Sequence, residues 1–164
     1  PFREDAELGV PISPYGATKR AAEIWGLTYH ALHEIPVVCV RPFSVYGPRM
    51  RPDLAMHVFA TAIVNSRGVP LLGDGTAQRD FTHVSDVCTG LLAALRPRGV
   101  EGQAINLGHN NPGTVRELLS MLERELGRKA EIDLLPAAAG DMPLSCADLT
   151  KAERLLGYRP RVPV

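Results

Sequence analysis

The sequence predicts an α/β fold in which helices alternate with short strands of a mainly parallel sheet. Residues 15–34 carry apolar side chains at helical spacing and stop before Pro36, and residues 37–40 follow as a continuous apolar run. Such a run is typical of a strand that is buried on both faces. The same alternation of helix and strand continues toward the C-terminus, which favours layers of helices and strands around one core.

The first half of the chain carries clear start and stop signals. Ser13 and Pro14 are suited to cap and begin the first helix. Residues 43–51 are expected to form a loop, because proline and glycine interrupt this stretch. Asp53 is expected to cap a second helix that ends near Gly68.

The second half follows the same rules. Thr114 and Glu117 have the spacing of a capping box at the start of a helix, and Gly127 is placed to end that helix. The remaining predicted elements are strands at 69–72, 103–107 and 131–135, helices at 84–95 and 151–156, and a tight turn at 73–75.

Composition narrows the classes of function. The 164 residues suffice for one domain, and 18 basic residues balance 18 acidic ones, so neither nucleic acid nor a membrane surface is an expected partner. Cys39, Cys88 and Cys146 lie among apolar or small neighbours, which predicts buried reduced thiols and a cytoplasmic location. Trp25 is expected in the core. The histidines show no convincing ligand spacing, so no metal site is predicted.

Tyr15 and Lys19 are the candidate catalytic residues. Four positions apart on a helix, they share one face within one turn. Oxidising an alcohol by hydride transfer needs a base for the hydroxyl proton, and a free phenol, with a pKa of about 10, is protonated at neutral pH. A lysine one turn away supplies positive charge that stabilises the phenolate. Pairs of this spacing are common in helices, so the motif needs its context.

That context comes from short motifs distributed along the whole chain. They are PISPYGATKRAAE at 11–23, VRPFSVYGPR at 40–49, GDG at 73–75, RDFTHVSDV at 79–87, NLG at 106–108, GDMP at 140–143, AD at 147–148 and LGYRP at 156–160. In this order and spacing they resemble nucleotide-sugar epimerases and dehydratases of the extended short-chain dehydrogenase/reductase family, above all UDP-glucuronate and UDP-glucose 4-epimerases. The resemblance implies the C-terminal part of a doubly wound Rossmann-type parallel sheet plus a smaller α/β substrate-binding lobe.

The resemblance also implies roles for individual residues. Tyr15 would act as acid and base on the sugar hydroxyl, and Lys19 would bind the nicotinamide ribose of NAD. Pro42 and Phe43 would pass beside the nicotinamide and complete the cofactor contacts. The expected substrate contacts are Ser44, Arg51, Arg79 and Asp141.

Arg51 bears on the choice of substrate. Residues 47–55 resemble the loop of UDP-glucuronate 4-epimerases in which an arginine faces the substrate carboxylate. An ordinary surface arginine ahead of Asp53 is the alternative, and the sequence leaves both interpretations open.

The sequence also departs from the family pattern. No G-x-x-G-x-x-G or G-x-G-x-x-G motif follows a strand, residues 137–139 are alanines where many relatives carry a phosphate-binding arginine, and the chain begins at Pro1. These features predict a single C-terminal fragment, residues 1–164, that is inactive alone. Residues 1–45 and 69–110 would belong mainly to the Rossmann core with the catalytic helix, and residues 46–68 and 111–164 mainly to the substrate-binding lobe.

The expected activity of the complete enzyme is NAD-dependent epimerisation at C4 of a UDP-sugar, UDP-glucuronate or UDP-glucose, through a transient 4-keto intermediate. Two alternatives stay open: a nucleotide-sugar 4,6-dehydratase, which begins with the same oxidation, and a non-catalytic nucleotide-sugar-binding fragment. A homodimer through the helix of Tyr15 is the expected assembly.

Overall fold

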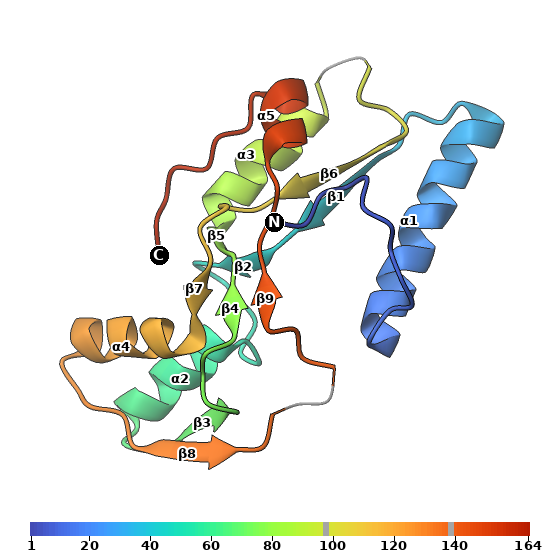
Figure 1. Ribbon diagram of the computed structural model, residues 1–164. Helices are drawn as coiled ribbons and strands as arrows, with labels where there is room; N and C mark the ends of the chain where they lie inside the picture. The colour runs from blue at the N-terminus through green and yellow to red at the C-terminus, as the bar shows by residue number, and fades with distance from the viewer. Residues whose placement is uncertain (97–98, 138–139) are drawn as a thin grey trace.

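The structure is an α/β arrangement of parallel strand pairs and covering helices, as the sequence predicts (Figure 1). This computed structural model describes residues 1–96, 99–137 and 140–164. In chain order the elements are α1 (Pro14–His33), β1 (Val38–Pro42), β2 (Ser44–Tyr46), α2 (Ala55–Val64), β3 (Val69–Leu72), β4 (Gln78–Arg79), β5 (Phe81–His83), α3 (Val84–Ala94), β6 (Gln103–Leu107), β7 (Gly113–Thr114), α4 (Val115–Leu126), β8 (Ile132–Leu135), β9 (Leu144–Ser145) and α5 (Thr150–Leu156).

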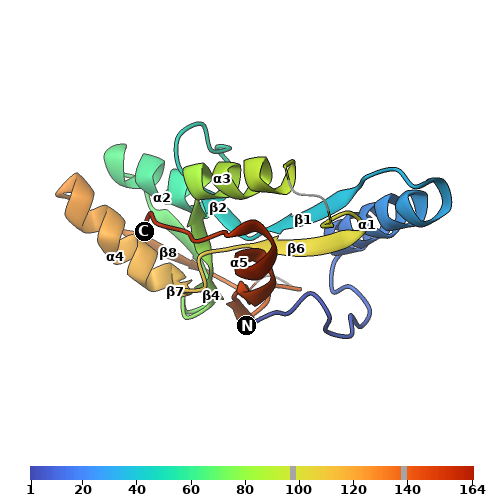
Figure 2. The ribbon, with the colours of Figure 1, turned by 90° about the horizontal axis from the view of Figure 1, so that it is seen from above.

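The first structural unit is the parallel pair β1–β6 with the helices around it. Val38 lies opposite Gln103 and Pro42 opposite Leu107. Helices α3 and α5 pack together against this pair, and α1 lies along β1 at one end of the molecule (Figure 2). The buried side chains that hold this unit together are Val87, Val100, Ile105, Leu107, Ala152 and Tyr158.

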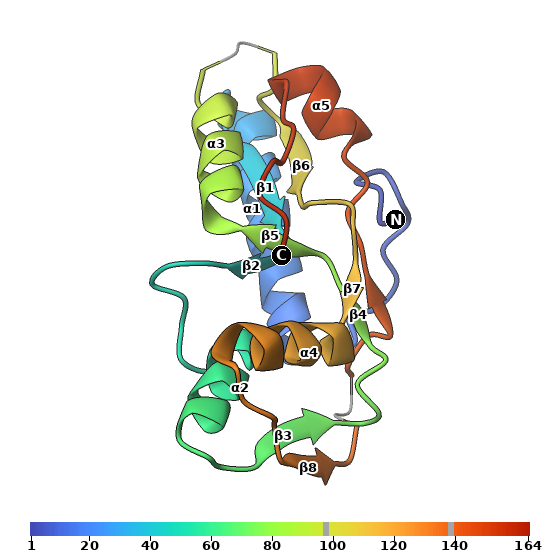
Figure 3. The ribbon, with the colours of Figure 1, turned by 90° about the vertical axis from the view of Figure 1, so that its left-hand side faces the viewer.

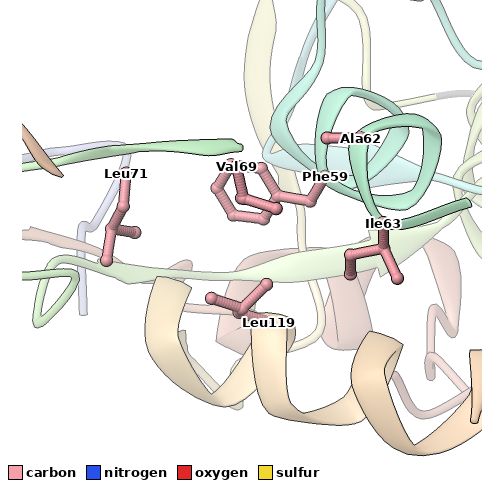
Figure 4. Close-up of a cluster of buried hydrophobic side chains, with 6 residues drawn as sticks. All are labelled: Phe59, Ala62, Ile63, Val69, Leu71 and Leu119. Carbon is pink, nitrogen blue, oxygen red and sulfur yellow. The ribbon is translucent and has the colours of Figure 1, made fainter. Parts of the chain in front are cut away.

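The second structural unit, called here the α2–α4 lobe, consists of α2, β3, α4 and β8. Strands β3 and β8 pair in parallel, and the two helices pack beside them (Figures 1 and 3). Its core is a cluster of six buried apolar side chains from α2, β3 and α4 (Figure 4), namely Phe59, Ala62, Ile63, Val69, Leu71 and Leu119. Strand β3 thus packs with α2 and α4, whereas α5 packs on β6.

Three short strands lie between the two units (Figure 3). Strand β4 pairs antiparallel with β7 and parallel with β9. The chain passes directly from β4 through Asp80 to β5, which pairs in parallel with β2. Strand β4 therefore lies between the sheet core and the α2–α4 lobe, where a binding site can be assembled (Figures 1 and 3).

Several local predictions are confirmed. Ser13 caps α1 by accepting a hydrogen bond from the Gly16 N–H, and Pro14 opens the helix. The capping box of Thr114 and Glu117 is complete, and Gly127 ends α4 at a positive φ of 62°. A left-handed conformation of this kind carries little steric cost for glycine, which has no Cβ. No helix within the described ranges is long and apolar enough to span a bilayer.

Two predictions for residues 43–53 are wrong. Residues 44–46 form β2 rather than loop, because they pair with β5 from a distant part of the chain. Asp53 does not cap α2; the N-cap is Leu54 without a side-chain hydrogen bond, and the Asp53 carboxylate pairs with Arg51 instead.

Two burial predictions are also wrong. Trp25 is 70% exposed, because α1 has no buried residue and the face that carries this side chain is not covered. Cys88 is exposed on α3, whereas Cys146 is buried as expected and Cys39 is partly buried. Helical spacing predicts which residues share a face, but the tertiary structure decides which face is covered.

Candidate active site

Helix α1 presents Tyr15 and Lys19 on one face near its start. The Ser13 cap, with a distance of 3.1 Å from its Oγ to the Gly16 nitrogen, fixes where the helix begins. Tyr15 is therefore in the first turn and Lys19 in the second, and the Lys19 Nζ lies 5.4 Å from the centroid of the Tyr15 ring. An ammonium at this distance is attracted to the aromatic face.

The ends of β1 and β2 form the wall opposite this helix. After Pro42 the chain changes its pairing partner from β6 to β5. The Phe43 N–H still donates to the Leu107 carbonyl of β6 at 3.0 Å. The Ser44 N–H then donates to the Asp80 carbonyl, also at 3.0 Å, and β2 begins. These backbone bonds fix Pro42, Phe43 and Ser44 at the point where the strand changes partner. The carboxyl ends of parallel strands, at such a crossing, are the usual place for a ligand in this class of fold.

Arg79 in β4 is held by three hydrogen bonds. Its Nη1 donates to the carbonyl oxygens of Gln78 at 2.8 Å and of Met142 at 2.7 Å, and its Nη2 donates to the Asp141 carboxylate. The Arg79 side chain is only 19% exposed. The planar guanidinium is thus fixed in one orientation, which suits it for binding a phosphate or a ribose.

Asp80 anchors the backbone behind Arg79. It is fully buried, and its carboxylate accepts hydrogen bonds from the N–H groups of His109 at 2.7 Å, Asn110 at 3.1 Å and Ala147 at 2.8 Å. These bonds join β4 to the segment after β6 and to the segment after β9. Asp80 therefore binds backbone groups and holds these segments together.

Arg51 lies on the same cavity but is held loosely. Its Nη2 is 3.3 Å from the Asp53 carboxylate, and both side chains are exposed. An exposed pair of this kind is weak, so the Arg51 guanidinium is available to an anionic ligand.

One cavity of about 1440 Å³ brings the predicted residues together. It lies between α1, the β1–β2 segment, β4 and the α2–α4 lobe, and its volume exceeds the 300–1,000 Å³ or so that holds a single drug-sized ligand. All eight residues proposed from the sequence line it, namely Tyr15, Lys19, Pro42, Phe43, Ser44, Arg51, Arg79 and Asp141.

An ion pair between Glu23 and Arg41 also lines the cavity and was missed by the sequence reasoning. Arg41 donates through Nε and Nη2 to the two carboxylate oxygens of Glu23, at 2.7 and 2.6 Å. These hydrogen bonds hold the pKa of Glu23 below its usual range and raise the pKa of Arg41. A signal was present: Arg41 is a charged residue inside an otherwise apolar strand, and Glu23 lies one turn beyond Lys19.

Within residues 1–96, 99–137 and 140–164, no three His, Cys, Asp or Glu side chains gather in a way that could hold a metal ion. Of the alanines noted where many relatives carry an arginine, Ala138 and Ala139 lie outside the described residues.

Comparison with known proteins identifies the family. The profile of the NAD dependent epimerase/dehydratase family matches residues 1–108, which is 108 of the 164 residues. The chain belongs to this family. NAD is the cofactor of the family, and solved structures of its members contain it.

Relatives within the family include both epimerases and dehydratases. A UDP-glucuronate 4-epimerase of Thermodesulfobacterium geofontis is 39% identical over 165 residues, which cover all of this chain and 50% of the relative. The UDP-glucuronic acid 4-epimerase of Bacillus cereus, solved with UDP-glucuronic acid and NAD, is 38% identical with a TM-score of 0.95, over 99% of this chain and 52% of that one. DesIV, a dTDP-glucose 4,6-dehydratase of Streptomyces venezuelae solved with NAD and TYD, is 31% identical with a TM-score of 0.92, over 98% of this chain and 49% of that one. The chain thus spans about half the length of the relatives it matches.

Proposed function

We propose that this chain supplies the catalytic pair and the substrate-binding wall of an NAD-dependent UDP-sugar 4-epimerase. The observation that supports the proposal is that Tyr15 and Lys19 of α1 line a single cavity with Arg79, which comes from the distant strand β4. Such a cavity combines a proton-transfer group, a cation beside it and a guanidinium for phosphate. The identity of 39% to a UDP-glucuronate 4-epimerase over the whole chain supports the same activity.

Proton transfer at the sugar is the task proposed for Tyr15. Its phenolate would accept the proton of the 4′-hydroxyl when the sugar is oxidised, and the phenol would return that proton to the 4-keto sugar when it is reduced on the opposite face. Lys19, 5.4 Å from the ring centroid, favours the phenolate by its charge. The proton starts and ends on the substrate, which matches an epimerisation without net redox change.

The residues present fit the nicotinamide end of NAD. Lys19 forms no ion pair with any described residue, so its three N–H donors are available to ribose hydroxyls, and Pro42 and Phe43 offer an apolar wall. When bound, NAD supplies hydride transfer to and from C4′ of the sugar. Because no glycine-rich phosphate motif occurs in these 164 residues, we propose that a segment preceding Pro1 in the complete protein cradles the pyrophosphate.

The substrate would lie along the opposite side of the cavity. Arg79 is oriented to bind a phosphate or the ribose, with Asp141 beside it and the Ser44 hydroxyl near the end of β1. Arg51, exposed and only loosely paired, is proposed to face the carboxylate of a glucuronate. This assignment predicts a preference for UDP-glucuronate over UDP-glucose.

A 4,6-dehydratase is the second candidate, and the similarity to DesIV favours it. Both reactions begin with the same oxidation at C4′, so Tyr15 and Lys19 serve either. The dehydratase then needs an additional acid and base for the elimination of water across C5′ and C6′. We rank it second because the loop around Arg51 resembles that of the epimerases.

The assembly and the state of the isolated chain are also proposals. The exposed apolar side chains of α1, including Trp25 and Leu32, support a homodimer formed through this helix. The missing pyrophosphate cradle supports the expectation that these 164 residues alone neither retain NAD nor turn over substrate. Three free cysteines in the described residues agree with a reducing, cytoplasmic location.

The test is to incubate the full-length protein with NAD and, in separate reactions, UDP-glucuronate, UDP-glucose or dTDP-glucose, and to identify the products by chromatography. Formation of the 4-epimer from UDP-glucuronate is expected. Conversion of UDP-glucose alone would refute the role of Arg51, and a 4-keto-6-deoxy product would establish the dehydratase. If no sugar nucleotide is converted and none binds, the proposal fails.

A further inference from the structure

The Glu23–Arg41 ion pair joins the catalytic helix to the strand beside it. Glu23 is in α1, one turn beyond Lys19, and Arg41 is in β1, immediately before Pro42. The two hydrogen bonds of 2.7 and 2.6 Å use both carboxylate oxygens, and the side chains are 17% and 25% exposed. A bidentate pair of this burial is more strongly held than the exposed pairs of this molecule.

Helix α1 also approaches the β1 segment closely near the pair, at Gly26. An added Cβ at Gly26, three residues beyond Glu23, would lie 3.2 Å from Val37 Cγ1 and 3.4 Å from Cys39 Sγ, so glycine permits this approach. Because α1 has no buried residue, the few contacts between α1 and β1 determine the orientation of the helix face that carries Tyr15 and Lys19. Glu23 is therefore fixed between Arg41 and the face that carries Tyr15 and Lys19.

Without Arg41, Glu23 would have another partner within reach. Lys19 and Glu23 are four residues apart on one helix, which is a spacing at which opposite charges pair. In the structure Lys19 makes no such pair with a described residue, and its ammonium lies beside the Tyr15 ring. The ionisable groups that share the cavity with Tyr15 are Lys19, Arg20, Glu23, Cys39, Arg41, Tyr46, Arg51, Asp53, Arg79 and Asp141. Of the three carboxylates among them, Asp53 pairs with Arg51 and Asp141 pairs with Arg79. The third, Glu23, is the one that lies one helical turn from Lys19.

We propose that Arg41 is a positioning residue that occupies the Glu23 carboxylate and so reserves the Lys19 ammonium for Tyr15. The inference rests on the proposed function, because it assigns Lys19 to the support of the Tyr15 phenolate. It concerns the charge that Tyr15 experiences and not the folding of α1. Removing Arg41 would free Glu23 to pair with Lys19 and draw positive charge away from the phenol.

The test compares variants of the full-length protein that differ in whether residue 23 carries a negative charge and whether that charge has a partner. Arg41→Gln leaves the carboxylate without a partner, Arg41→Lys keeps a countercharge, and the double variant Glu23→Gln/Arg41→Gln removes both charges. The acidic limb of the kcat–pH profile is expected to move up by about one pH unit in Arg41→Gln, a tenfold loss on that limb. Arg41→Lys and the double variant are expected to keep the wild-type limb. A merely structural role would instead make all three variants lose activity at every pH.

A second variant tests the inference with the ion pair left intact. Ala22 is exposed, lines the cavity and lies three residues beyond Lys19, a spacing that also allows pairing. Ala22→Glu adds a carboxylate that Arg41 does not hold, and it is expected to move the acidic limb upward, whereas Ala22→Gln is not. This comparison does not depend on whether Arg41→Gln folds.

A spectroscopic readout separates this inference from the proposed function. The 13Cζ signal of Tyr15, assigned by its absence in Tyr15→Phe, is followed with pH in each variant that carries Tyr15, without sugar nucleotide. Its titration midpoint should move to higher pH in Arg41→Gln and Ala22→Glu only, even if no substrate is converted. An unchanged midpoint in Ala22→Glu, or an equal shift in the double variant, overturns the inference.

Discussion

Arg79 and Asp141 form an ion pair across 62 residues of sequence, between β4 and the segment that precedes β9. The same guanidinium also donates to the Met142 carbonyl at 2.7 Å. Both residues line the cavity with Tyr15 and Lys19. If a phosphate binds Arg79 as proposed, it must share the guanidinium with the Asp141 carboxylate or displace that carboxylate.

Replacing Arg79 is expected to weaken nucleotide binding. Arg79→Ala should lower the affinity of the full-length protein for UDP at least tenfold, because a hydrogen bond to a charged group contributes about 1.5–3 kcal/mol. Isothermal titration calorimetry with UDP measures this. Arg124→Ala removes an exposed arginine of α4 that pairs only weakly with Glu125, and it should leave the affinity unchanged. Equal affinities for wild type and Arg79→Ala would show that the nucleotide lies elsewhere.

Replacing Tyr15 is expected to remove proton transfer without removing binding. Tyr15→Phe should lower kcat by about 10²- to 10⁴-fold, the usual contribution of a general acid or base, while the dissociation constant for UDP stays the same. Tyr29→Phe is the matched control, because Tyr29 is an exposed tyrosine of the same helix. Comparable turnover by Tyr15→Phe and Tyr29→Phe would rule out the assigned role.

Asp80 is expected to be the most costly acidic residue to remove. Asp80→Ala leaves the N–H groups of His109, Asn110 and Ala147 without their acceptor in a buried site. Each unsatisfied buried group costs about 1–3 kcal/mol, so the free energy of unfolding should fall by about 3 kcal/mol or more. Urea denaturation measures this. Asp53→Ala, at an exposed position, should change it by about 0.5 kcal/mol or less, and a similar small change for Asp80→Ala would contradict the bonding described.

The capping box of α4 is expected to make stability depend on pH. Hydrogen bonds from the Thr114 N–H and hydroxyl hold the pKa of Glu117 below its usual range. A carboxylate whose pKa is lower in the folded than in the unfolded protein contributes stability above its unfolded pKa, near 4.3, and that contribution is lost as the pH falls through the folded value. Glu117→Gln keeps a side-chain acceptor but no longer titrates.

The measurement is thermal unfolding of wild type and Glu117→Gln from pH 7 to pH 3. The stability difference between them should shrink toward low pH, because residue 117 loses a charge only in the wild type. Glu125→Gln serves as the control, since Glu125 is an exposed glutamate of the same helix with one long contact to Arg124. A constant difference across the pH range would mean that the Glu117 charge does not contribute.

Local features of the fold were accessible from the sequence because short-range interactions produce them. The Ser13 cap and the box of Thr114 and Glu117 depend on residues three positions apart. Residues 37–40 were predicted as a strand because they form a continuous apolar run, and β1 forms over residues 38–42. The roles of Tyr15 and Lys19 remain proposals, but their shared helix face follows from spacing alone.

The strands that join the two units had no such local signal. Strand β2 forms because Ser44 to Tyr46 pair with residues 81–83, and β4, β7 and β9 are only two residues long. Pairing of this kind is decided by neighbours far apart in sequence, so proline and glycine around residues 43–51 suggested a loop. Trp25 shows the same limit: its helix was predicted, but burial depends on what covers the helix.

By itself the sequence determined the helices and main strands, the motifs of an NAD-dependent epimerase/dehydratase, and the eight residues of the candidate site. Propensity, capping and residue spacing act over a few residues, and a family pattern consists of motifs in a fixed order along the sequence. The tertiary structure alone decided that these residues line one cavity, that Arg79 pairs with Asp141, and that Arg41 pairs with Glu23. Those relationships depend on distances between atoms of different elements, which exist only once β1, β4 and α1 have packed together.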